Sequence, residues 1–61
     1  MKLQELFNIE AMTDDQLFQL FYMGQQMADT MWRRGDPEGC EEYSELWGAV
    51  DDLLSARGAW A

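Results

Sequence analysis

The side chains that could do chemistry in this chain are almost all carboxylates. The sequence has twelve acidic residues, no histidine and a single cysteine, Cys40. General acid–base catalysis would therefore rest on Asp and Glu alone, and an ordinary zinc site lacks its ligands. Adjacent acids such as Asp14 and Asp15 diverge by about 100° on a helix, so they do not converge on one site. We expect no enzymatic activity, no catalytic residue and no cofactor.

A second set of acids recurs at helical spacing, so that its members share a helix face. Such a face could attract a hard cation, but a cage of oxygen ligands requires a loop of the EF-hand kind, which is absent, so we expect no metal site. The face either keeps a small apolar-rich protein soluble, or imitates a nucleic-acid backbone and docks on a basic patch of a larger protein. This acidic face comprises Glu38, Glu41, Glu42, Glu45 and Asp52.

The charge balance bears directly on partners. Four basic residues against twelve acids give the 61-residue chain a net charge of −8. Binding to nucleic acid or to an anionic membrane depends on Lys and Arg, so both partners are disfavoured. Arg33 and Arg34 are best explained as cations at a helix C-terminus, although a dimer that clusters them could contact phosphates. No apolar run is long enough for a membrane span, and we expect a cytoplasmic protein.

The elements that position these residues are predicted to be helices in a single domain, residues 1–61. Thr13 and Gln16 form a capping-box pattern that starts a helix over 14–34, and Gly35 ends it. Asp36 and Pro37 then start a helix over 37–57. With so short a connection, these two helices fold back as an antiparallel hairpin. A short helix over 2–9 precedes them, and 8–12 is the linker. The fold class is therefore all-α.

The third helix has an ordinary amphipathic pattern. Its apolar residues lie within an arc of about 140°, which is a normal core stripe. Cys40 lies at the edge of this stripe and is interpreted as a small buried hydrophobe. Gly48 interrupts the helix, and it marks either the close approach of another backbone or a loss of about 1 kcal/mol of helix stability.

The second helix is apolar over about 260°, whereas a helix with one buried face needs little more than 100°. We therefore expect a helical homodimer with the second helices at its centre. The alternatives are a monomer wrapped by its own N-terminus and a chain that awaits another partner. Methionines four residues apart either fill the core or form an adaptable binding surface. The predicted self-association or partner surface is Phe18, Tyr22, Met23, Met27 and Trp32.

The two most distinctive stretches of the sequence are residues 32–37 (Trp-Arg-Arg-Gly-Asp-Pro) and residues 41–47 (Glu-Glu-Tyr-Ser-Glu-Leu-Trp). In size, acidity and three-helix pattern the whole chain resembles the small helical accessory proteins from early regions of lambda-like phages. That resemblance implies a regulatory protein, often dimeric, that acts by binding host proteins. The function we expect is non-enzymatic modulation of a larger host or regulatory protein. The alternative is an acidic nucleic-acid mimic that inhibits a DNA- or RNA-binding protein.

Overall fold

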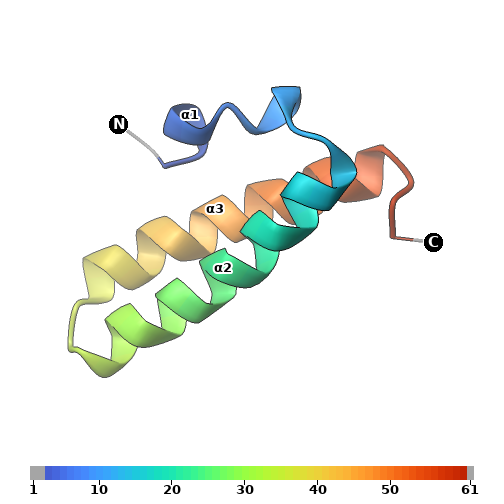
Figure 1. Ribbon diagram of the computed structural model, residues 1–61. Coiled ribbons are helices and arrows are strands. Elements are labelled where there is room, and N and C mark those ends of the chain that lie inside the picture. The colour runs from blue at the N-terminus through green and yellow to red at the C-terminus, as the bar shows by residue number, and fades with distance from the viewer. Residues whose placement is uncertain (1–2, 61) are drawn as a thin grey trace.

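The chain folds as a helical hairpin with a short N-terminal segment laid across it. The computed structural model describes residues 3–60, and over these residues it contains helices and no strand. The elements in order are α1 (Leu3–Phe7), the 3-10 helix η1 (Ile9–Ala11), α2 (Asp14–Arg33) and α3 (Pro37–Ala56). Figure 1 shows α2 and α3 side by side and antiparallel, with α1 and η1 above them. The predicted all-α hairpin is confirmed.

The start of α2 has the predicted capping box. The backbone N–H of Gln16 donates to the Thr13 hydroxyl oxygen at 3.2 Å, and the backbone N–H of Thr13 donates to Oε1 of Gln16 at 2.9 Å. These bonds satisfy two donors that the first turn of a helix otherwise leaves free. Asp36 caps α3 in a similar way, because its Oδ1 accepts from the backbone N–H of Gly39 at 3.0 Å.

Both long helices end in the same backbone motif, one residue before the predicted ends. After α2, Gly35 has a φ of 77°, and the N–H of Asp36 donates to the carbonyl of Met31 at 2.9 Å. After α3, Gly58 has a φ of 73°, and the N–H of Ala59 donates to the carbonyl of Leu54 at 2.9 Å. Glycine adopts this left-handed conformation without the clash of a Cβ. The motif turns the chain sharply enough for α3 to start at Pro37.

The core lies between α2 and α3. Its buried side chains are Leu17, Leu20, Leu46, Val50 and Leu54. The two helices lie close together at Gly24, where an added Cβ would lie 3.0 Å from Cβ of Trp47. At Gly48 an added Cβ would meet no atom of residues 3–60 within 4 Å. Of the two interpretations of Gly48, close backbone approach is therefore wrong, and the glycine that permits close packing is Gly24.

The N-terminal segment differs from the single short helix predicted over 2–9. Residue 2 lies outside the described residues, and α1 ends at Phe7 because Asn8 has a left-handed φ of 48°. Asparagine tolerates that conformation better than most residues. The predicted linker contains a helical turn of its own, η1. Leu3 and Ile9 from this segment pack against the core, and α1 lies on α3. Within the described residues, α1 therefore packs mainly on α3 rather than on α2.

Arg57 joins the end of α3 to the segment before α2. Its Nη1 donates to the carbonyl of Met12 at 2.7 Å and to Oδ1 of Asp14 at 3.1 Å, and its Nη2 donates to the carbonyl of Glu10 at 2.9 Å. A guanidinium suits this role because its donors form a rigid fork. The Arg57 contacts therefore fix the end of the hairpin that lies opposite the α2–α3 turn.

Candidate interaction surface

The wide apolar arc of α2 is covered partly by the chain itself. Leu17, Leu20, Gly24 and Ala28 are buried toward α3. On one flank of α2, the ring of Trp60 lies 5.1 Å from Phe18 and 5.4 Å from Phe21, centroid to centroid and edge to face. Aromatic rings attract one another in this geometry. Phe18 is half-buried under Trp60, so this member of the predicted surface is not freely exposed.

The rest of the predicted surface divides into exposed and half-buried residues. Tyr22, Met23 and Trp32 are 56%, 38% and 67% exposed, whereas Met27 is half-buried. Trp32 also borders a shallow apolar hollow with Gly35 and Pro37 beside the hairpin turn. Tyr22 and Trp32 lie on a different side of α2 from Met23, since about 100° separates successive residues. The five residues therefore do not form one continuous patch.

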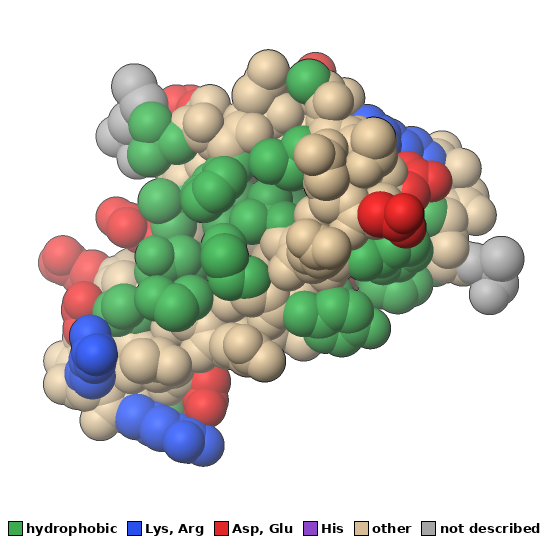
Figure 2. Space-filling view, viewed as in Figure 1, with side chains coloured by type: hydrophobic (Ala, Val, Ile, Leu, Met, Phe, Trp, Pro, Cys, Tyr) green, Lys and Arg blue, Asp and Glu red, His purple; other side chains and the backbone are tan. Residues whose placement is uncertain are grey.

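Met23 belongs to a second apolar area that sequence reasoning did not assign. A hollow of about 230 Å³ lies between the N-terminal segment and α2, with Phe7, Met12, Leu20 and Met23 in its walls. Two glutamines, Gln16 and Gln19, complete it, so none of its lining residues is charged. Figure 2 shows hydrophobic side chains gathered below α1, over the hairpin. The exposed large apolar side chains of the described chain are Leu6, Phe7, Tyr22, Met23, Trp32 and Trp60.

The acidic face is exposed along α3. All five of its carboxylates are exposed, namely Glu38, Glu41, Glu42, Glu45 and Asp52. Within residues 3–60 the ion pairs are Arg33–Asp29 and Arg57–Asp14. Glu38, Glu41 and Glu42 therefore face solvent without a basic partner from these residues. A patch of one sign steers an oppositely charged partner toward it.

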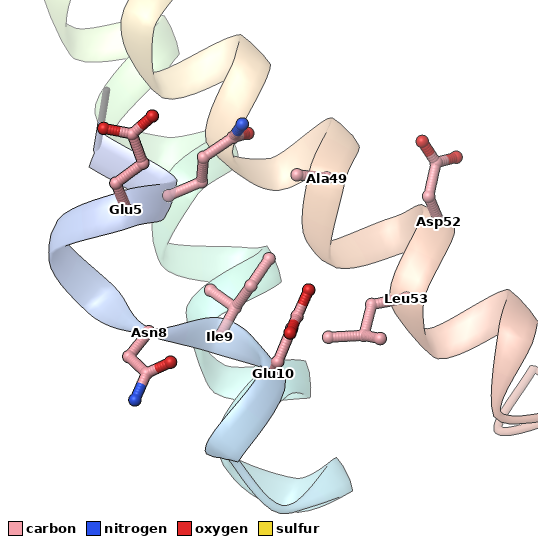
Figure 3. Close-up of a pocket in the computed structure, with 8 residues that line it drawn as sticks. Glu5, Asn8, Ile9, Glu10, Ala49, Asp52 and Leu53 are labelled. Carbon is pink, nitrogen blue, oxygen red and sulfur yellow. The ribbon is translucent and has the colours of Figure 1, made fainter. Parts of the chain in front are cut away.

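Asp52 also borders a hollow of about 570 Å³, lined by both polar and apolar residues, between the N-terminal segment and α3. Figure 3 shows Ile9 and Leu53 at its centre, with Glu5 and Asp52 on its opposite sides. Glu5 and Glu10 were not assigned to any site from the sequence, and only the packing of α1 and η1 on α3 brings them near Asp52. Within residues 3–60, no three acids or thiols are grouped closely enough to hold a metal ion.

The arginines and the cysteine have mainly local contacts. Nη2 of Arg33 lies 3.1 Å from Oδ2 of Asp29, one turn earlier in the same helix, and Arg34 is the C-cap of α2. Both arginines are exposed, and the ion pair of Arg33 lies within α2. Cys40 is half-buried and has a free thiol. No described helix is both long and apolar enough to cross a lipid bilayer.

Comparison with models of protein families, with curated proteins and with solved structures gave no match for this chain. The functional argument therefore rests on the surfaces described above.

Proposed function

We propose that the chain is a non-enzymatic interaction protein of the cytoplasm that self-associates as a homodimer and modulates a larger host or regulatory protein. The observation that carries this proposal is the exposure of Tyr22, Met23 and Trp32 on α2. Large aromatic residues and methionine are enriched in protein interfaces relative to the rest of a protein surface. The resemblance to phage accessory proteins, which often act as dimers on host proteins, is consistent with the same role.

Size supports self-association in particular. A chain of about 60 residues buries only about 60% of its unfolded surface, so a second copy is a common source of additional stability. Trp60 covers one flank of α2, and α1 lies on α3. The outer side of α2 is therefore the part of the hairpin with room for another chain.

Sedimentation velocity at micromolar concentration tests the proposal. We expect a species of about twice the 7.1 kDa chain mass. Tyr22→Ser combined with Met23→Ser should shift the species toward the monomer, because it removes two exposed apolar side chains. The matched control is Glu41→Ser with Glu42→Ser, two adjacent exposed residues on α3, which should leave the dimer intact. A wild-type chain that sediments as a monomer would refute self-association.

A second candidate function, an acidic mimic of nucleic acid, is favoured by the exposed carboxylates of α3. Its test is competition with duplex DNA for a purified basic DNA-binding domain. Competition should weaken steeply with added salt. It should be lost when Glu38, Glu41 and Glu42 are changed to Gln. The control is Glu5→Gln with Glu10→Gln, which neutralises two exposed acids of the N-terminal segment. Competition that does not change with salt would instead favour the apolar surface.

A further inference from the structure

The outer side of α2 carries a strip of exposed residues that is opposite to its buried face. Positions 15, 19, 22, 26, 29 and 33 alternate in steps of four and three, which places them along one side of the helix. All six side chains are exposed. We call these residues the outer strip: Asp15, Gln19, Tyr22, Gln26, Asp29 and Arg33.

The charge distribution along this strip is asymmetric. The middle of α2, from Gln16 to Ala28, has no charged residue and is the longest such run in the chain. The strip begins with the acid Asp15 and ends with the base Arg33. In Figure 2, charged side chains gather near the two ends of α2, and green and tan surface lies between them.

We propose that this strip pairs with the same strip of a second copy, with the two α2 helices antiparallel. The two-fold axis passes between Tyr22 and Gln26 on the outer side of α2. The inference rests on the self-association proposed above and adds its surface, direction and register. A two-fold contact requires a surface that is complementary to itself. In this register Asp15 lies opposite Arg33 of the second copy, and Tyr22 lies opposite Gln26 of the second copy. Both relations occur twice by symmetry.

Other arrangements place like charges together. A parallel pairing of α2 would place Arg33 beside Arg33 and Asp15 beside Asp15 of the second copy, which is unfavourable at close range. A contact through α3 would bring two acidic faces together, with Glu38, Glu41 and Glu42 on each. Because each chain has a net charge of −8, a second copy can approach closely only where acids are absent or matched by bases. The outer strip is the long helix face that meets this condition.

The decisive comparison is between two neighbouring glutamines. Gln26→Glu inserts a carboxylate into the centre of the proposed contact, where desolvation disfavours it. Gln25→Glu makes the same chemical change at an exposed residue about 100° away around the helix. By sedimentation equilibrium, we expect the dimer dissociation constant to rise about tenfold or more for Gln26→Glu, and less than about threefold for Gln25→Glu. Circular dichroism confirms that both variants remain helical.

The direction of pairing has its own test. Arg33→Glu should weaken the dimer because it faces Asp15 of the second copy, whereas Arg34→Glu, next to it but off the strip, should have a smaller effect. Adding Asp15→Lys to Arg33→Glu should restore dimerisation, since the two charges are exchanged and still face each other. The wild type could be a dimer in which Gln26→Glu and Gln25→Glu have equal effects, or in which Asp15→Lys with Arg33→Glu does not restore dimerisation. Either result would refute the proposed strip but not self-association. A monomeric wild type overturns both.

Discussion

Removal of the Trp60 side chain is the most informative perturbation of this fold, because Trp60 covers the aromatic flank of α2. Trp32 offers a matched control, since Trp32→Ala removes the same side chain from a site without a ring contact among the interactions described above. Trp60 is 41% exposed and Trp32 is 67% exposed. Trp60 therefore buries roughly a quarter more of its surface than Trp32.

The expected difference follows from that burial. A quarter of a large aromatic side chain of the order of 200 Å² is about 50 Å², which corresponds to about 1.3 kcal/mol. The two ring contacts, at 5.1 and 5.4 Å, add about 0.5–1.5 kcal/mol each. We therefore expect Trp60→Ala to lower the free energy of unfolding by about 2–4 kcal/mol more than Trp32→Ala. For a chain of this length that is a large part of a total of about 3–9 kcal/mol.

Urea unfolding followed by far-ultraviolet circular dichroism measures this difference, because helix content does not depend on which tryptophan remains. The measurement is repeated at two protein concentrations so that dissociation is separated from unfolding. Equal unfolding free energies for Trp60→Ala and Trp32→Ala would refute the reasoning. That result would mean that Phe18 and Phe21 are covered by something other than the C-terminal tail.

Two further predictions concern single contacts. Arg57→Ala should lower the unfolding free energy by about 1–2 kcal/mol, because two backbone carbonyls and Asp14 lose a donor. Arg57→Lys should retain part of this stability. Faster amide exchange near Met12 would report the loss of the Arg57 contacts directly. Gly48→Ala should raise the unfolding free energy by about 0.5–1 kcal/mol through helix propensity, whereas Gly24→Ala should show no such gain because its Cβ meets Trp47. Thermal melts should therefore shift upward for Gly48→Ala and not for Gly24→Ala. Equal upward shifts would contradict the close helix contact at Gly24.

The features that could be predicted from the sequence are those determined by neighbouring residues. The Thr13–Gln16 capping box and the Asp36–Pro37 start each depend on a few adjacent positions. Gly35 and Gly58 end the helices for a local reason as well. Once these starts and stops are placed, the short connection leaves an antiparallel hairpin as the arrangement of the two long helices.

The features that could not be predicted depend on distant residues. The apolar arc of α2 is too wide for one partner helix to cover, and the sequence pattern therefore predicts a second chain. Part of that arc is instead covered by Trp60, which packs on Phe18 from more than forty positions away. The Arg57 contacts with Glu10 and Met12 depend in the same way on how α3 ends beside η1. The close contact at Gly24 could have been predicted, because Gly24 lies on the same helix face as Leu17 and Ala28, where a residue without a Cβ allows another backbone to approach closely.

The hairpin is held at its two ends by different means. At one end the chain itself joins α2 to α3 through a turn of a few residues, so that closing this short loop loses little chain entropy. At the other end, Arg57 and Trp60 close a loop of more than forty residues through noncovalent contacts. Folding should therefore begin beside the Gly35 turn and proceed toward the termini, and unfolding should take the reverse route. Protection of backbone amides from exchange should decline along both helices in that direction. The turn end would then stay closed while the end held by Arg57 and Trp60 opens and closes.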